Sequence, residues 1–553
     1  MRSLRRARLP SRSDAARDVS AGTVLGLVSV PDGLAAGLLA GLNPIAGLYG
    51  YLVGTLAGAL STSSVFMCVQ ATGAMAVVIA DVPQVRGQPD SAAALSTLGL
   101  LTGVLLLIAG LLRVGTLVRF VPNAVLTGFV NAVAVNIMLA QLAYLTGFSS
   151  EQGGRLARLL DTVVNVAGWR LPVVGVALLT LTVILLLERT RVGALALVVG
   201  VVAGSAAVWA LGLGDVPLVG DVADIPNSLP GIQVPSWSLV LPLLVPAVAL
   251  AFVAMVQGAA ITQSVPNPDG SYPDTSGDIR GQGMANLASA LLRGMPVGGS
   301  MSGTALALTA GARSRLANIV AAAVMALVIL LAADLAGHIA MPSLAALLLL
   351  VGYRTLKPDQ VRMVWRTGST QAAVMTTTFV LTLIIPLQYA VLAGIGISAV
   401  LFVVRQSNKV TVTSWTFHEG SPYPRERPAP QDLPGGEVLV LTAYGSLFFA
   451  SAQVVQAQLP RVTADSAGAV VILRLRGKED LGSTFIQTLL RYRDELHAYG
   501  SRLLLAGVGD RVLGQLERTG AYQRLGPDNV FPATERVGAS LTSALARAQE
   551  LRG

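Results

Sequence analysis

Two apolar segments of this chain are too short to cross a membrane as regular helices, although long apolar segments surround them. The first is 69–80, with the sequence VQATGAMAVVIA, and the second is 293–311, which contains Pro296, several glycines and a run of hydroxyl side chains. Backbone that departs from a helix is tolerated inside a bilayer only where protein or a water-filled cavity surrounds it. Two interrupted segments in corresponding halves of a sequence are typical of transporters built from inverted repeats, in which half-helix N-termini face the substrate.

The composition indicates an integral membrane protein. Of the 553 residues, 53% are hydrophobic and 12% are charged, whereas soluble domains carry roughly 25% charged residues. Arginines that flank membrane spans explain the net charge of +9, so nucleic-acid binding is not expected. One cysteine and three histidines give no basis for a disulfide framework, a metal site or another cofactor.

Charge and hydropathy divide the chain into four parts. Residues 1–18 are rich in arginine and lack a cleavable signal, which predicts a cytoplasmic arm. Residues 19–405 are almost continuously apolar and form the transmembrane part, and residues 406–436 are predicted to be a proline-rich linker. Residues 437–553 alternate strand-like and helical runs, which predicts a small cytoplasmic α/β domain.

The transmembrane part is predicted to hold about fourteen spans, because a helix needs ~20 residues to cross the bilayer. With the N-terminus inside, the inner loops carry Arg113, Arg189 and Arg354, whereas the outer loop 211–238 carries no lysine or arginine. Since these residues favour the cytoplasmic side, we expect a multi-pass plasma-membrane protein with both termini in the cytoplasm. The expected spans are 19–40, 44–60, 72–80, 92–112, 122–145, 172–187, 192–211, 239–264, 283–292, 303–311, 316–336, 341–353, 371–386 and 389–404.

Three sets of motifs, in the same order, resemble the SulP anion transporters, the sulfate-permease-like family that includes pendrin and prestin. VPDGLAA at 30–36 with LAGLNPIAGLY at 39–49 is similar to the first-span signature of that family. GSMSGTA at 299–305 with AGARS at 310–314 is similar to its tenth-span signature. LLLAGV at 503–508 with LERTG at 516–520 resembles its C-terminal STAS domain, which anti-sigma-factor antagonists share. The resemblance covers nearly the whole chain.

The resemblance implies a polytopic α-helical membrane protein with a seven-plus-seven inverted repeat. A core domain of spans 1–4 and 8–11 would move against a gate domain of spans 5–7 and 12–14, and the anion would lie between the N-termini of short spans 3 and 10. Relatives dimerise, so a homodimer is left open. The physics agrees, because helix N-termini present unpaired N–H groups and about half a positive charge, and can hold an anion without a fixed cation.

The expected substrate-binding residues lie mostly in the two short segments. Backbone N–H groups and hydroxyls there would replace part of the anion's water shell, whereas the alternative is that small residues merely let spans pack closely. Many SulP relatives carry arginine at the position of Gly303, so this chain lacks that cation. The expected set is Thr72, Gly73, Ala74, Ser302, Gly303 and Thr304.

Two further polar residues lie inside predicted spans. Gln257 is also expected in the substrate site; relatives usually carry Glu or Asp there, in some of them to help bind sodium, so an amide argues against sodium coupling. Asp32 stands where relatives often carry Gln. Because acids inside the membrane mark proton or ion paths, we hypothesise that Asp32 carries a coupling proton. The alternative is a carboxylate that faces cytoplasmic water at the mouth of the cavity.

The predicted activity is secondary active transport of a small anion, either inorganic or a dicarboxylate, by elevator-like proton symport. Anion exchange, sodium-coupled bicarbonate-type transport and a channel are kept as alternatives. No Gly-x-x-x-x-Gly-Lys-[Ser/Thr] motif occurs, so neither an ATP-driven pump nor an enzyme is expected. A nucleobase carrier normally lacks a domain like 437–553, and a membrane-anchored STAS signalling scaffold would not need interrupted spans. Ser483 aligns with the serine that is phosphorylated in anti-sigma-factor antagonists, and its modification is left open.

Overall fold

The computed structural model describes residues 12–85, 91–116, 122–152, 154–190, 192–222, 226–386, 410–417 and 423–552, with single residues and short runs between 389 and 404. The chain divides into two compact units, Met1–Ile395 and Gly396–Gly553, and each is considered by itself. Residues 1–11 of the predicted arm and half of the predicted span 389–404 lie outside the described residues, whereas 12–18 belong to the first helix.

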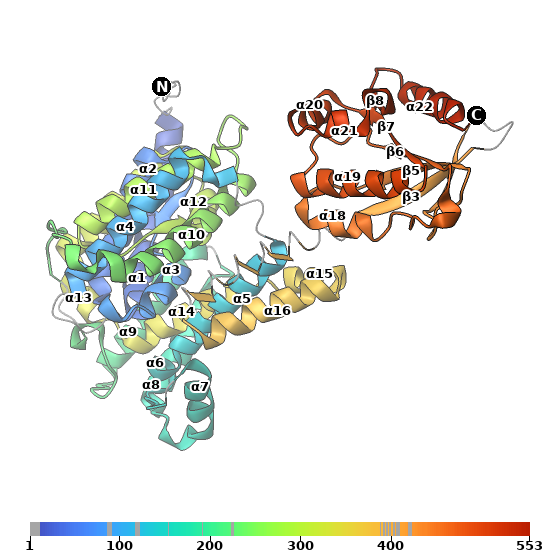
Figure 1. Cartoon of the computed structure of the whole chain (residues 1–553). Coiled ribbons are helices and arrows are strands. Elements are labelled where there is room, and N and C mark those ends of the chain that lie inside the picture. Colours follow the sequence, from blue (N-terminus) through green and yellow to red (C-terminus); the bar gives the residue numbers. More distant parts are fainter. Residues whose placement is uncertain are drawn as a thin grey trace. The chain divides into compact units, whose positions relative to one another are not determined.

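The helices of the first unit form two groups by their contacts with one another, and Figure 1 labels the members of both. The first group consists of α1 (Arg12–Leu39), α2 (Pro44–Ser61), α3 (Gly73–Ala80), α4 (Ser91–Leu111), α10 (Val240–Ser264), α11 (Thr275–Leu291), α12 (Met301–Thr309) and α13 (Leu316–Gly337). The second group consists of α5 (Asn123–Ala140), α6 (Leu142–Thr146), α7 (Arg155–Val164), α8 (Leu171–Leu187), α9 (Ala196–Ala210), α14 (Met341–Thr355), α15 (Pro358–Thr367) and α16 (Ser369–Ile384).

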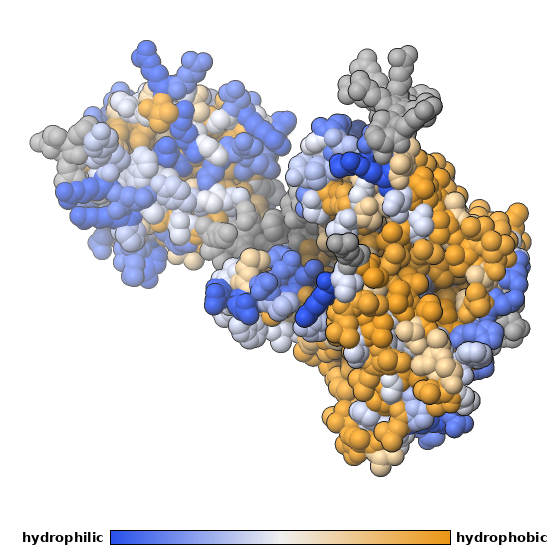
Figure 2. Space-filling model, turned by 180° about the vertical axis from the view of Figure 1, so that it is seen from behind, coloured by the Kyte–Doolittle hydropathy of each residue, from blue (hydrophilic) through white to orange (hydrophobic). Residues whose placement is uncertain are grey.

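The exterior of the first unit is suited to lipid. Within the described residues, seven helical segments are long and apolar enough to cross a membrane, and α8 and α16 are shorter apolar helices. Figure 2 shows hydrophobic residues over most of the visible face of this unit, whereas the other unit is mostly hydrophilic.

The two halves of the first group make the same contacts when α1 to α4 are matched in order with α10 to α13. α1 packs on α13 as α10 packs on α4, and α1 packs on α2 as α10 packs on α11. The short helices follow the same rule, because α3 contacts α10 and α12 contacts α1. This correspondence is what an inverted repeat of four-helix halves requires.

The first predicted span contains a proline, and the helix continues through it. α1 runs through Pro31 without interruption. A proline removes one backbone donor, and neighbouring helices can hold a membrane helix together across such a site. α2 packs directly on α1 here: a Cβ added at Gly47 would lie 2.1 Å from the carbonyl oxygen of Gly33.

The ninth predicted span begins too late. We expect it to start at 283, but α11 starts at Thr275 and includes a polar first turn. The carboxylate of Asp274 caps this helix by accepting hydrogen bonds from the N–H groups of Ser276 and Gly277, at 3.1 and 3.0 Å. A prediction from the length of the apolar segment misses a polar helical turn, because it does not see the partners that the polar groups find elsewhere in the fold.

The second unit is an α/β domain on a six-stranded mixed sheet with the order β4-β3-β5-β6-β7-β8. β5 to β8 run parallel, and β3 is antiparallel to both of its neighbours. The strands are β3 (Thr411–Thr416), β4 (Arg425–Pro428), β5 (Val438–Tyr444), β6 (Val470–Arg474), β7 (Arg502–Val508) and β8 (Val530–Pro532). The helices are α18 (Phe449–Gln456), α19 (Ser483–Ala498), α20 (Asp510–Arg518), α21 (Ala521–Leu525) and α22 (Ala539–Glu550).

Alternate residues of the central strands pack into cores on the two faces of this sheet. Val471 and Leu473 belong to the same core as Phe485 of α19, whereas Ile472 joins Ala544 of α22 in another. Strands buried on both faces explain the continuous apolar runs that the sequence shows. Ser483, the first residue of α19, is exposed.

The predicted linker 406–436 is partly wrong, because it contains β3 and β4. The alternating sequence TVTSWT of β3 has its Val412 and Ser414 buried, as a half-buried strand requires. β4 is an edge strand that ends at Pro428, where a missing backbone donor does not interrupt the sheet. The prolines that suggested a linker therefore belong in part to the edge of the folded domain.

Candidate functional site

The two interrupted segments meet in a short β-ribbon within the first unit. β1 (Cys68–Gln70) pairs antiparallel with β2 (Gly298–Ser300), with Cys68 opposite Ser300 and Gln70 opposite Gly298. α12 follows β2 directly, and α3 begins three positions after the end of β1. Because the strands are antiparallel, the two helices leave the ribbon in opposite directions and keep their N-termini beside it.

Each short helix is capped by a hydroxyl at its N-terminus. Thr72 Oγ1 accepts a hydrogen bond from the Met75 N–H at 3.4 Å, and Ser300 Oγ accepts one from the Gly303 N–H at 3.0 Å. Each cap binds the third N–H of its helix, so the first two N–H groups lie beyond its reach. Thr72 and Ser300 therefore lie next to the first two N–H groups of each helix, which the caps leave without a bond.

Four backbone N–H groups have no hydrogen-bond partner among the residues that the structure describes. They belong to Gly73 and Ala74 of α3 and to Met301 and Ser302 of α12. Lysine and arginine are absent from 68–80 and from 298–309, so these two segments offer an anion the positive potential of their helix ends and no side-chain cation. Two helix ends of about +0.5 elementary charge each, with free donors, suit an anion.

Gly303 and Thr304 belong to the expected substrate-binding set, but their polar groups already have partners within the protein. The Gly303 N–H is taken by Ser300. Thr304 is 1% exposed, and its hydroxyl accepts from the Cys68 N–H at 3.1 Å and donates to the Ser300 carbonyl at 2.6 Å. Thr304 therefore ties α12 to the ribbon, while Met301, which the sequence reasoning left out, offers an amide.

Gln257 of α10 reaches the same place. Thr72 Oγ1 donates a hydrogen bond to Gln257 Oε1 at 3.1 Å, and a Cβ added at Gly298 would lie 3.2 Å from that oxygen. The amide of Gln257 therefore lies over the ribbon beside the N-terminus of α3. Its side chain is half-buried, and its Nε2 has no partner in the described part of the chain.

Asp32 lies in α1, a helix that contacts both α3 and α12. Its side chain is partly exposed, and it forms no hydrogen bond or ion pair with the described residues. This sets it apart from Asp18 at the start of the same helix, which is fully buried and accepts hydrogen bonds from the N–H groups of Arg313 and Ser314.

Buried side-chain amides satisfy the backbone that leads into the ribbon. Asn286 accepts from the Val297 N–H at 2.9 Å and donates to the carbonyl of the same residue at 2.7 Å. Gln282 Oε1 accepts from the Gly299 N–H at 2.9 Å, and Asn318 donates to the Met67 carbonyl at 3.2 Å. Irregular backbone at this depth needs such internal partners.

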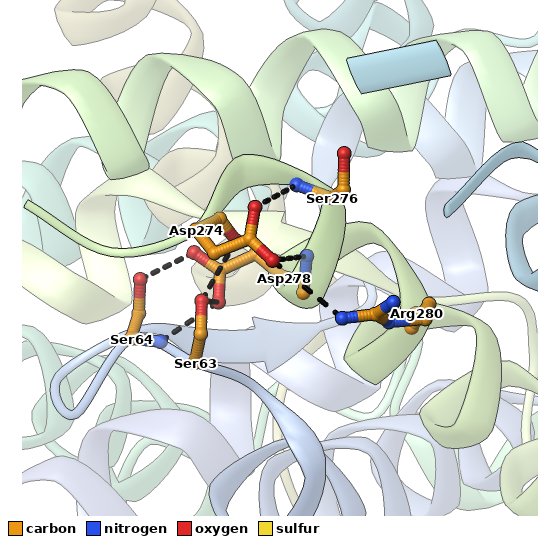
Figure 3. Close-up of polar contacts among 7 residues, drawn as sticks. Ser63, Ser64, Asp274, Ser276, Asp278 and Arg280 are labelled. Carbon is orange, nitrogen blue, oxygen red and sulfur yellow. Dashed lines mark hydrogen bonds and ion pairs between the residues drawn. The ribbon is translucent and has the colours of Figure 1, made fainter. Parts of the chain in front are cut away.

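A buried carboxylate fixes the turn that precedes β1 (Figure 3). Asp278 is fully buried and accepts hydrogen bonds from Ser63 Oγ and the Ser64 N–H, both at 2.7 Å, from Ser64 Oγ at 2.5 Å and from Thr262 Oγ1 at 2.8 Å. The guanidinium of Arg315 donates to the Ala59 and Thr62 carbonyls at 2.6 Å, which satisfies the end of α2. The loop into the ribbon is thus held by α10, α11 and α13.

Sequence reasoning missed these supporting residues. Asn286, Gln282 and Asn318 have no motif of their own, but each is an amide inside an apolar segment, where a polar side chain needs a partner. That observation alone marks them as bound to something, although it does not identify the partner.

Comparison with known proteins agrees with this architecture. The model of the sulfate permease family matches residues 16–378, and the STAS domain model matches residues 434–536. The chain belongs to the sulfate permease family. It is therefore a multi-pass membrane transporter of anions and not an enzyme, with a C-terminal STAS domain.

Similar proteins extend over nearly the same length. The putative sulfate transporter YvdB of Bacillus subtilis is 23% identical over 521 residues, which is 93% of this chain and 96% of YvdB. The bicarbonate transporter BicA of Picosynechococcus is 23% identical over 529 residues, 94% of this chain and 93% of BicA. The overall structure of SLC26A9 matches with a TM-score of 0.86 at 18% identity, covering 98% of this chain and 91% of that one.

Proposed function

We propose that this transporter carries a small anion that binds between the N-termini of α3 and α12, and that it couples this movement to a proton. The observation that carries the proposal is the set of N–H groups at two helix ends, joined by one ribbon, that have no partner among the described residues. YvdB is named a putative sulfate transporter and BicA a bicarbonate transporter, which supports a small inorganic anion over a dicarboxylate as the substrate.

The proposed movement is that of an elevator. The ribbon and both short helices belong to the first helix group, so a displacement of that group against the second would carry the bound anion with it. Beside Gly73 the contact between the groups is apolar, because a Cβ there would lie 2.7 Å from Ile137 Cδ1 of α5. At the other end of α3, an ion pair between Asp81 and Arg155 links the two groups. An apolar contact without directional bonds can slide at low cost, because the hydrophobic effect is non-directional.

Asp32 is the proposed proton carrier. Its carboxylate lacks a partner among the described residues and stands on a helix that touches both short helices. When it is ionised, it would oppose an anion at the site, and when it is protonated that repulsion disappears. Anion and proton would then bind together, which is the requirement of symport.

Uptake into proteoliposomes tests the function. Purified protein is offered radiolabelled chloride, formate, bicarbonate, sulfate and oxalate, with imposed pH or sodium gradients and with or without anion inside. We expect saturable uptake that an inward proton gradient drives and a sodium gradient does not. A requirement for internal anion would replace symport by exchange, and uptake without saturation would indicate a channel.

The Asp32→Asn variant tests the proton coupling. We expect it to keep anion uptake down the anion gradient and to lose the stimulation by acid outside. Asp359→Asn is the matched control, because Asp359 has a side chain that is 92% exposed on α15. Proton-driven uptake that persists unchanged in Asp32→Asn refutes the role of Asp32. Deletion of 406–553 tests the scaffold alternative: uptake that persists in the truncated protein rules out a membrane-anchored scaffold as the main role.

A further inference from the structure

Gln70, the last residue of β1, reaches from the ribbon to both α1 and α12. It is 2% exposed, and its Nε2 donates a hydrogen bond at 3.1 Å to Oγ of Ser29 in α1, which is equally buried. Its other amide atom, Oε1, lies against the first turn of α12 at Gly303. The side chain is therefore held at one end by α1 and lies against the first turn of α12 at the other.

Gln70 fills the room that a side chain at position 303 would need. A Cβ added at Gly303 would lie 2.4 Å from Gln70 Oε1, whereas the next atoms, Ser300 Oγ and Cys68 Cβ, are 3.1 and 3.2 Å away. A distance of 2.4 Å is shorter than any non-bonded contact between carbon and oxygen. Glycine at 303 and glutamine at 70 are thus complementary, and only Gln70 stands strongly in the way.

The charge of the site, together with the position of Gln70, bears on which anions can bind. Two helix ends supply about one positive charge in total, and lysine and arginine are absent from 68–80 and 298–309. A monovalent anion is then nearly compensated, whereas a divalent anion keeps about one uncompensated charge away from water, which is costly. The Gln70 carbonyl, itself partly negative, adds to that cost and fills the room beside Gly303 in the first turn of α12.

We propose that Gln70 is a specificity-determining residue that favours monovalent over divalent anions. The proposal rests on the anion site between α3 and α12 described above. It assigns the transported substrate to the class of bicarbonate, formate or chloride, in preference to that of sulfate or oxalate.

Two variants of Gln70 test the selectivity. Gln70→Ala opens the space and removes the carbonyl, so we expect the uptake ratio of chloride, formate or bicarbonate to sulfate or oxalate to fall by about tenfold. Gln70→Glu has the same shape but places a carboxylate there, so we expect monovalent uptake to be lost at high pH and to return as acid protonates the side chain. A role in folding alone would lower all uptake equally, so an unchanged ratio together with an unchanged pH profile would overturn the proposal.

A double-mutant cycle on thermal stability tests the geometry without any substrate. Introduced into the wild-type protein, Gly303→Ala should lower the melting temperature. Introduced into Gln70→Ala, the same substitution should lower the melting temperature much less, because the obstructing oxygen is gone. Gly175→Ala is the control, since a Cβ there meets nothing within 4 Å. An equal cost of Gly303→Ala in both backgrounds refutes the complementarity. If the wild-type protein carries no anion at all, the proposed function fails, whereas an unchanged ratio in an active variant counts only against Gln70.

Discussion

Two carboxylates one helical turn apart should respond very differently to the same substitution. Asp278 is fully buried and accepts four hydrogen bonds, whereas the Asp274 side chain is 62% exposed and caps α11. Both residues can be changed to asparagine without altering shape. Because they share one helix and one loop environment (Figure 3), each serves as the control for the other.

The expected cost follows from the hydrogen bonds. In Asp278→Asn, one oxygen can keep the bonds from Ser63 Oγ and the Ser64 N–H, which become neutral. The new NH2 group faces the hydroxyls of Ser64 and Thr262, which must turn round to accept. Hydrogen bonds to charged groups contribute about 1.5–3 kcal/mol and neutral ones about 0.5–1.5, so we expect a loss of roughly 2–4 kcal/mol.

The same change at Asp274 should cost little. Asparagine is about as good an N-cap as aspartate, and the exposed ion pair with Arg280, at 3.5 Å, is worth about 0–1 kcal/mol. Thermal unfolding of the purified protein in detergent measures both variants. At about 2 °C per kcal/mol, the melting temperature should fall roughly 4–8 °C for Asp278→Asn and by about 1 °C for Asp274→Asn. Equal shifts, or a larger one for Asp274→Asn, would refute the assignment of Asp278 as the anchor of the β1 turn.

Two further outcomes follow from packing and charge. Gly47→Ala should abolish a monodisperse peak in size-exclusion chromatography, because its Cβ would collide with backbone of α1, whereas Gly175→Ala, with open space around it, should not. In the STAS domain, the hydrogen bond from Arg493 and the nearby Arg524 lower the pKa of Asp494. The stabilisation from ionised Asp494 is then present above the ordinary pKa of an aspartate and is lost as the pH falls through the lowered value. Asp494→Asn should therefore make the loss of domain stability at acid pH, measured by fluorescence, less steep. A loss as steep as that of the wild type would contradict this.

Much of the fold follows from apolar length and from breaks in it. The glycines and hydroxyls of 69–80 and 293–311 predict two short helices, and α3 and α12 begin within two residues of the expected positions. Extended apolar runs likewise predict β5, β6 and β7. These features are local, so a single sequence carries them.

The pairing that organises the site is not local. β1 and β2 are more than two hundred residues apart, and each has three residues, too few for a strand signal. The buried partners Asn286 and Asp278 owe their roles to atoms contributed by other helices. Sequence patterns identify such residues as unusual, but only the fold shows which backbone groups they satisfy.

The central claim is that the first N–H groups of α3 and α12 hold the anion, and proline at a first helical position tests it directly. Proline is well tolerated at the first helical position because the N–H it lacks makes no helical bond there. Gly73 is such a position, and the preceding Thr72 has the extended ψ of 156° that a following proline requires. Gly73→Ala is the matched control, because it adds the same Cβ against Ile137 and keeps the N–H.

Equilibrium binding of the transported radiolabelled anion to both purified variants is the deciding measurement. A hydrogen bond to an anion contributes about 1.5–3 kcal/mol, so Gly73→Pro should bind about tenfold or more weakly than Gly73→Ala, at the same melting temperature. Equal affinities in the two variants would show that this amide does not touch the anion and would contradict the account.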